Sequence, residues 1–403
     1  MTTGAGDTAR GGGRLSRRTL AVVAAIYFVE GFPFGVFRDV WPVYFRTHGV
    51  SLEAIGWLSG LALAWSLKFL WSPLLDLGDK RRWITGCLVA MALALLALAG
   101  LDPHALAIPT WAVLGLFCVA SATQDVAIDA YTIALVPRGE EGPANAARIT
   151  AYRVGLIAAG GGLLLLPDRV GWRLTFVAAA LLCAGLAAAI GASPRVDPLR
   201  ADRPSLSQAF AGWRLRGGAA GVLAFVLLYR LGDSSMAPMV KPFWVDRGMS
   251  LAEIGAVSTS LGALATVVGA WIGGAWVARR GIGAALLPVG VLAMASNLAY
   301  AAAAQWPASG RPGLYAASLS ESFCGGLAAA AFMAFLMRIC EREHAAVQYA
   351  CLSALYALPG TAAGVLSGHA VSAFGYAATF AMTALLALPA LALVSRARRW
   401  ADG

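Results

Sequence analysis

The chain has 403 residues, of which 59% are apolar and 13% are charged; a soluble domain carries about twice that charged share. A bilayer-spanning helix takes about 20 apolar residues, so twelve spans need about 240 and leave enough chain for tails and short loops. This composition excludes a soluble globule. The net charge of +10 does not indicate a nucleic-acid partner, because the basic residues flank apolar runs.

Hydropathy and helix-breaking residues predict an all-α polytopic membrane protein with twelve transmembrane helices. The predicted helices span about 19–46, 52–74, 83–100, 106–136, 143–166, 172–192, 218–246, 251–278, 283–304, 313–339, 345–372 and 374–395. The longest connection, 194–217, is polar and rich in arginine, and it separates the first six helices from the last six.

Basic residues favour one side of the predicted membrane. Roughly 20 lie on the side of both termini and the linker, against about six on the other, and cytoplasmic loops are the basic ones. Arg17 and Arg18 resemble an export signal, but Glu30 interrupts the following apolar run, so we interpret them as anchors of the first span. We therefore expect a cytoplasmic tail (1–18), an N-terminal bundle (19–193), a cytoplasmic linker (194–217), a C-terminal bundle (218–395) and a cytoplasmic tail (396–403).

The two halves share a repeated segment. Residues 49–56 (GVSLEAIG) and 248–255 (GMSLAEIG) match at five of eight positions, and each copy joins an odd-numbered span to the next. The alternative is chance similarity between two serine-capped helix starts. A repeat at half the chain length predicts two pseudo-twofold bundles related by an axis along the membrane normal.

Charged side chains at hydrocarbon depth cost several kcal/mol unless they are paired or hydrated, so each is a candidate functional residue. Asp125 and Asp129 stand four residues apart on one helix face, about 6 Å from each other. Two carboxylates that close resist ionising together, which suits a proton-coupling site. Lys68, Arg148 and Arg153 are expected at similar depth, and a static salt-bridge cluster is the competing interpretation.

Glu30 is the alternative proton carrier, and it becomes the better one if Asp125 is fully paired with Arg153. It is followed by residues 31–35 (GFPFG). Because Pro33 removes a backbone hydrogen bond and the glycines permit bending, we predict that the helix breaks at Glu30. The alternative is a simple kink in which Glu30 bonds the neighbouring backbone.

The second half offers fewer candidates. Arg230 and Asp233 stand three residues apart on the seventh span and either face a cavity or only neutralise each other. Glu321, Gln348 and Tyr349 are candidates to line the second bundle's share of that cavity.

Several segments resemble one group of transporters. Residues 68–76 (KFLWSPLLD), 124–130 (QDVAIDA), 151–155 (AYRVG), 250–255 (SLAEIG), 321–326 (ESFCGG) and 348–349 (QY) are similar to the peptide, acetyl-coenzyme A and drug transporter group of the major facilitator superfamily. The resemblance covers about residues 20–395 and implies the fold of two six-helix bundles. It points to Lys68, Gln124, Asp125, Asp129, Tyr152, Arg153, Glu321, Gln348 and Tyr349 as site residues.

The resemblance implies proton-coupled import of a bulky polar, muropeptide-like solute across the bacterial cytoplasmic membrane by alternating access. The short C-terminal end and residues 31–35 are similar to ferric-siderophore importers of the same group, and acetyl-coenzyme A is a third candidate solute. A non-transporting assembly or sensor protein is a further alternative. A membrane acyltransferase is disfavoured because no paired histidines occur, and no metal site is indicated because no CxxC spacing occurs. We expect a monomer in the lipid bilayer that uses the proton gradient and no cofactor.

Overall fold

The computed structural model describes residues 17–104, 106–136, 141–195, 213, 217–341 and 345–402, and this part of the chain contains helices and no strand. Short π or 3-10 turns are labelled η. The first half contains α1 (Arg17–Gly35), η1 (Val36–Val40), α2 (Trp41–Thr47), α3 (Leu52–Leu58), η2 (Ser59–Ala62), α4 (Leu63–Leu67), η3 (Lys68–Leu70), η4 (Ser72–Leu77), α5 (Lys80–Leu98), α6 (Ile108–Leu135), α7 (Glu141–Ile157), η5 (Ala158–Gly162), η6 (Leu163–Leu165) and α8 (Pro167–Gly191).

The second half contains α11 (Ala219–Leu228), α12 (Leu231–Asp246), α13 (Leu251–Glu253), η7 (Ile254–Leu261), α14 (Gly262–Arg280), α15 (Ile282–Gln305), η8 (Pro307–Ser309), α16 (Gly310–Ile339), α17 (Ala345–Leu385) and α18 (Leu388–Asp402). Most of the expected linker, 194–217, lies outside the described residues.

Nine helical stretches of the described chain are long and apolar enough to cross a membrane. The other three predicted spans also correspond to helical segments of the structure. Residues 52–77 are helical but interrupted by 3-10 turns, and 141–165 are helical and less apolar. The stretch Cys351–Ala401 is too long for one span and turns at Gly375, whose φ is 78°. The described helices are therefore consistent with twelve spans.

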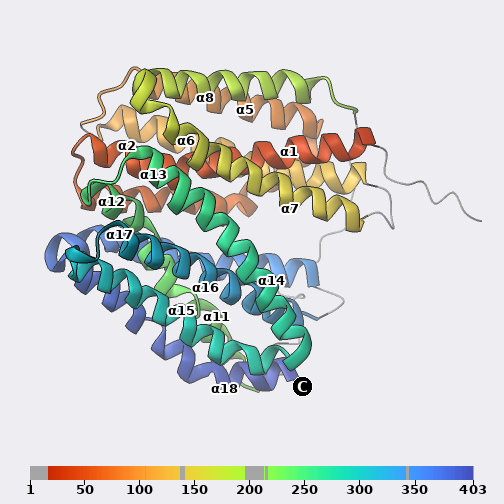
Figure 1. The fold of residues 1–403 in the computed structure, drawn as a ribbon. Coiled ribbons are helices and arrows are strands. Elements are labelled where there is room, and N and C mark those ends of the chain that lie inside the picture. Colours follow the sequence, from red (N-terminus) through yellow and green to blue (C-terminus); the bar gives the residue numbers. More distant parts are fainter. Residues whose placement is uncertain are drawn as a thin grey trace, which may run out of the picture.

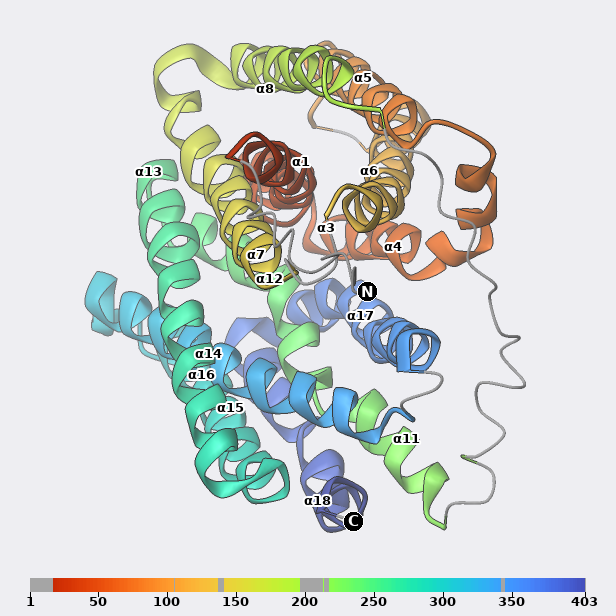
Figure 2. The same cartoon turned by 90° about the vertical axis from the view of Figure 1, so that its right-hand side faces the viewer.

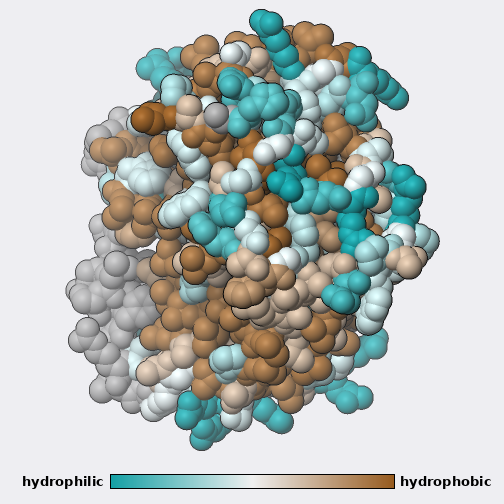
Figure 3. All heavy atoms as spheres, turned by 90° about the vertical axis from the view of Figure 1, so that its left-hand side faces the viewer, coloured by the Kyte–Doolittle hydropathy of each residue, from teal (hydrophilic) through white to brown (hydrophobic). Residues whose placement is uncertain are grey.

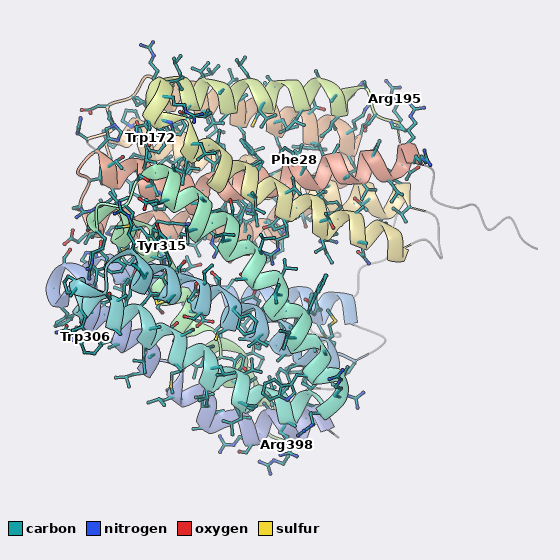
Figure 4. All side chains as sticks on the ribbon, viewed as in Figure 1. Phe28, Trp172, Arg195, Trp306, Tyr315 and Arg398 are labelled. Carbon is teal, nitrogen blue, oxygen red and sulfur yellow. The ribbon has the colours of Figure 1, made fainter. Side chains whose placement is uncertain are left out.

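The helices form two bundles, one from each half of the chain (Figure 1). In the N-terminal bundle α1 packs on α7, and α5 packs on α6 and α8; in the C-terminal bundle α16 packs on α14 and α15, and α12 on α17. The start of α1 and the end of α18 lie at the same end of the molecule, which we call the terminal face, and Figure 2 looks onto it. Arg195 and Arg398 lie there, whereas Trp172 and Trp306 lie at the opposite face (Figure 4).

The repeat is visible in the backbone. Gly49 and Gly248, at equivalent positions of the repeated segment, both have positive φ, 79° and 68°. Gly171 and Gly375 form a second such pair, with φ of 78° at both. Only glycine adopts this conformation without strain, so matching glycines mark matching turns. The two halves thus share local geometry at two separate turns, which chance similarity of helix starts does not explain.

The bundles meet at the opposite face, where α3 and η2 pack on α17, α2 on α12, and η5 on η7. A Cβ on Gly368 of α17 would clash with the carbonyl oxygen of Leu52, so glycine allows this contact. One apolar core crosses the contact and contains Trp41 of the first half and Trp244 of the second. We call this contact region the junction. Figure 3 looks onto the opposite face, where hydrophilic residues gather mainly over the N-terminal half.

The prediction that the first helix breaks at Glu30 is wrong. α1 is continuous to Gly35 with Pro33 inside it, and the irregular turn, η1, begins after that glycine. The glycines serve close packing instead of bending, because a Cβ on Gly31 would clash with the backbone of Tyr152 on α7. The helix is therefore continuous past Glu30 although it carries a proline, and its glycines let α7 pack closely against it.

Candidate functional site

Each acidic residue of α6 is held by a different cation. The Lys68 ammonium lies 3.3 Å from a carboxylate oxygen of Asp125, and the Arg148 guanidinium lies 3.3 Å from one of Asp129. The Tyr27 hydroxyl donates to Asp129 at 2.9 Å, and Arg148 lies 4.7 Å from the centre of the Tyr27 ring. The structure thus places both carboxylates in ion pairs that join α6 to the second and fifth spans. We call these two the bundle pairs.

Glu30 lies beside these pairs without belonging to one. Its Oε2 atom is buried and has no hydrogen-bond partner, and none of the described residues forms an ion pair with it. The strongest charges acting on it are those of Asp125, Asp129, Arg148 and Lys68. A carboxyl group in this position is surrounded by charge but not neutralised by a dedicated cation.

Gln124 satisfies a backbone group that Pro33 leaves free. A proline has no N–H, so the carbonyl of Val29, four residues earlier, lacks its helical partner. The Gln124 side-chain amide donates to that carbonyl at 3.1 Å, and Gln124 is buried. Gln124 therefore joins α6 to α1 next to Glu30, and it acts on the site by fixing the helix that carries Glu30.

Tyr152 and Arg153 lie on α7, and the backbone of Tyr152 packs against Gly31, the residue after Glu30. Tyr152 is half-buried and feels the charges of Asp125, Glu30 and Arg38. Arg153 has no ion pair or hydrogen bond to a described residue, and it lies near Arg38. Asp125 pairs with Lys68 and not with Arg153. The Asp125–Arg153 pair, the stated condition for Glu30 being the better proton carrier, is therefore not formed, and Lys68 stands in the place of Arg153.

The C-terminal bundle carries a smaller group. The Arg230 guanidinium lies 3.6 Å from the Asp233 carboxylate and donates to the carbonyl of Gly325 at 3.4 Å. Glu321 of α16 feels the charges of both, but its only hydrogen bond to a described residue is a long one, 3.4 Å, from Ser322. Glu321 therefore resembles Glu30 in lacking a cation of its own.

Gln348 and Tyr349 lie apart from this group, at the start of α17. Gln348 is fully buried, where it accepts from the Glu341 N–H at 2.7 Å and donates to the Glu341 carboxylate at 3.2 Å. The Tyr349 hydroxyl donates to the sulfur of Met333 at 3.4 Å. Gln348 joins the start of α17 to Glu341, just after the end of α16, through hydrogen bonds that do not involve the Arg230–Asp233 group.

Among the residues that the structure describes, two ion pairs cross from one bundle to the other, and neither was assigned a role from sequence. Buried Lys241 of α12 lies 3.6 Å from Asp39 of η1 and donates to Ser258 at 2.9 Å and to Thr259 at 2.7 Å. In the second, Arg46 binds Asp246 through both of its carboxylate oxygens, at 2.5 and 2.9 Å, and the Tyr376 hydroxyl also donates to Asp246 at 2.7 Å. The sequence signal was available: the charged residues of the first and seventh spans stand a similar distance before Gly49 and Gly248. We call these two the junction pairs.

Two bundles with ionisable residues held inside apolar spans define a polytopic membrane protein of the transporter class. The family model of the Major Facilitator Superfamily matches residues 23–229. The chain is 32% identical to the anhydromuropeptide permease of Escherichia coli (strain K12), over 93% of this chain and 78% of the permease. It is 27% identical to the putative transporter AmpG 4 of Rickettsia conorii, over 90% of this chain and 92% of that protein.

Solved structures share the fold. A bacterial homologue of the human lysosomal transporter Spinster, inward-facing and unoccupied, matches with a TM-score of 0.78 and 16% identity over 95% of this chain and 97% of the homologue. The nucleoside transporter NupG matches with a TM-score of 0.75 and 15% identity over 94% of this chain and 98% of NupG. The chain therefore belongs to the major facilitator superfamily and is a multi-pass membrane transporter.

Proposed function

We propose that this protein is a proton-coupled importer of a bulky polar, muropeptide-like solute in the bacterial inner membrane, with both termini cytoplasmic. The similarity to the anhydromuropeptide permease supports the solute class. The excess of arginine near the described end of α14 and α18, at Arg279, Arg280, Arg398 and Arg399, supports the orientation. The transporter works as a monomer without a cofactor.

The observation that carries proton coupling is the unpaired carboxyl group of Glu30. Glu30 is half-buried, and its Oε2 atom is shielded from water. A carboxylate oxygen shielded in this way and without a cation is costly, and binding a proton removes the charge. Once deprotonated, Glu30 competes with Asp125 for Lys68 and with Asp129 for Arg148. Proton release would thus loosen the bundle pairs, which join the helices around the site.

Alternating access follows if the junction opens as the terminal face closes. The structure has the junction closed, and the junction pairs hold it. Because a proton can drive a solute only if both bind the two states with different affinity, the proposal requires that protonation of Glu30 changes the balance between these states.

The test is uptake by the purified protein in liposomes with an inside-alkaline pH gradient. We expect an anhydromuropeptide to accumulate, and a protonophore to abolish the accumulation. Ferric siderophore and acetyl-coenzyme A are the comparison solutes. Accumulation of either one without the muropeptide would overturn the solute class, and equal uptake with and without the gradient would overturn proton coupling.

Glu30→Gln separates proton coupling from solute binding. We expect gradient-driven accumulation to fall at least tenfold, while exchange of internal for external solute, which needs no net proton movement, stays near the wild-type rate. Asp168→Asn, at an exposed acid of the opposite face, is the matched control and should leave both assays unchanged. Undiminished accumulation by Glu30→Gln would show that Glu30 is not the coupling residue.

A further inference from the structure

Arg38 and Arg153 stand out among the cations of the spans because they lack a partner. Lys68, Arg148, Arg230 and Lys241 each lie within 4.0 Å of a carboxylate oxygen. Within the described part of the chain, Arg38 and Arg153 have neither an ion pair nor a hydrogen bond. Glu30 is not their counter-ion, since the cations that act on it most strongly are those of the bundle pairs.

Both arginines lie along the contact between the first and fifth spans. Arg38 belongs to η1 and Arg153 to α7, and η1 packs on η5, which continues α7. Asp39, next to Arg38, contacts Gly160 closely enough that a Cβ there would clash with it. The backbone of Tyr152, next to Arg153, contacts α1 just as closely. The positions of both residues are therefore fixed by tight helix packing, and only the long side chains are free to move.

Arg38 faces the space between the bundles and not the lipid. Its side chain is exposed although it lies well inside the first span. Its charge acts on Arg153 of the same bundle and on Lys241 and Glu321 of the other. An exposed cation with charged neighbours on both bundles must border water-accessible space, because a lipid-facing arginine would have neither water nor these neighbours.

We propose that Arg38 and Arg153 together bind an anionic group, a carboxylate or phosphate, of the transported solute. Two like charges near each other at membrane depth repel, and an anion between them removes the repulsion and supplies the missing acceptor. Planar guanidinium groups bind carboxylates and phosphates through paired hydrogen bonds. This inference rests on the proposed function in that the ligand is the transported solute.

The experiment compares an anhydromuropeptide that keeps its free carboxylates with the same molecule after amidation, by equilibrium binding to the purified protein. We expect the wild type to bind the free carboxylate form at least tenfold more tightly. Arg38→Gln and Arg153→Gln should each remove most of that preference while leaving the affinity for the amidated form unchanged. Arg38→Lys and Arg153→Lys should retain part of it, because lysine keeps the charge but loses the planar fork.

Arg169→Gln is the matched control, since Arg169 is an exposed arginine of the opposite face, and it should leave the preference intact. Equal loss of affinity for both forms in the Arg38 and Arg153 variants would show a structural role and overturn the inference, as would no loss at all. Retained binding of the amidated form shows that a variant is folded.

The outcome is distinguishable from failure of the proposed function. If the wild type binds acetyl-coenzyme A but no muropeptide, the proposed solute class is wrong, and the same variants are then measured with acetyl-coenzyme A, whose phosphates are the anionic groups. An unchanged affinity for that solute in both glutamine variants would overturn the arginine site on its own.

Discussion

The bundle pairs and the junction pairs are chemically alike but join different bodies. The bundle pairs connect helices of one bundle, so they can persist while that bundle moves as a unit. The junction pairs connect the first bundle to the second, so they must break when the junction opens. In the proposed mechanism, the bundle pairs belong to the proton site and the junction pairs to the equilibrium between the two states; this division follows from which bodies each pair joins and not from the strength of the pair.

Their surroundings agree with this division. The bundle pairs lie beside an unsatisfied carboxyl oxygen, that of Glu30, and beside the carbonyl freed by Pro33. The junction pairs lie where glycines bring backbones into contact and where one apolar core runs through both bundles. The surroundings of the bundle pairs contain polar groups that can exchange hydrogen-bond partners. The surroundings of the junction pairs contain close backbone and apolar contacts, which are lost together when the two bundles separate. Removing members of each group should therefore affect different measurements.

The largest effect is expected within the bundle pairs. Asp125→Asn or Asp129→Asn should abolish gradient-driven uptake, a loss of at least tenfold in accumulation, while membrane insertion is spared. Each change leaves Lys68 or Arg148 without its carboxylate. Under the proposed mechanism, that cation then pairs with Glu30 and holds the Glu30 carboxylate in its charged form. Uptake by reconstituted protein measures the first effect and the yield of membrane-inserted protein the second. Unchanged accumulation in both variants would remove these residues from the mechanism.

Lys241→Gln should act on the junction and not on the proton site. Removing one member of a buried pair leaves the other charge uncompensated, at a cost of about 3–5 kcal/mol, so the closed junction loses population. Ser59 contacts Gly364 of α17 across the junction; labelling of Ser59→Cys by an impermeant maleimide should accelerate in the Lys241→Gln background. The double variant Lys241→Gln/Asp39→Asn should be labelled more slowly than Lys241→Gln alone, because the uncompensated carboxylate is then removed. Labelling at the original rate in the single variant would contradict the division between the two groups.

Gln124→Ala tests whether the hydrogen bond from Gln124 to the Val29 carbonyl compensates for the backbone bond that Pro33 removes. Loss of the amide leaves the carbonyl of Val29 buried and unpaired, which should lower the free energy of unfolding by about 1–3 kcal/mol. Pro33→Ala restores the backbone N–H, so Gln124→Ala should cost less in that background. Equal costs in the two backgrounds, measured by thermal unfolding in detergent, would show that the bond from Gln124 does not compensate for Pro33.

Hydropathy predicted the helices because burial in lipid selects apolar residues whatever the tertiary contacts. The turn at 372–374 was predicted within a few residues of Gly375, since glycine with positive φ ends a helix. The second span was harder: residues 52–77 contain 3-10 turns that no pattern of apolar residues indicates. The continuity of α1 past Glu30 was also unpredictable, because the sequence does not show that α7 packs against its glycines.

The charged residues of the site could be selected from sequence, but their partners could not. Depth follows from position in a span, whereas pairing depends on the rotation of each helix about its axis and on which helices are neighbours. Lys68 pairs with Asp125 across 57 positions of chain, and Arg46 with Asp246 across 200. Gln348 was predicted to line a cavity of the second bundle, but the structure places it at the start of α17, where it bonds Glu341.

Arg46→Gln provides the smallest and most discriminating comparison. Arg46 and Asp246 form a paired hydrogen-bonded contact, but both side chains are about one-quarter exposed, so water screens the attraction and the pair contributes about 0.2–1 kcal/mol. The Tyr376 hydroxyl continues to bond Asp246 after the substitution. We therefore expect Ser59→Cys labelling to rise less than about fivefold, well below the effect of Lys241→Gln, and we expect the effect to diminish at high salt. A larger increase in labelling for Arg46→Gln than for Lys241→Gln would contradict this expectation. It would show that the exposed pair controls the junction and that burial does not set the strength of a junction pair.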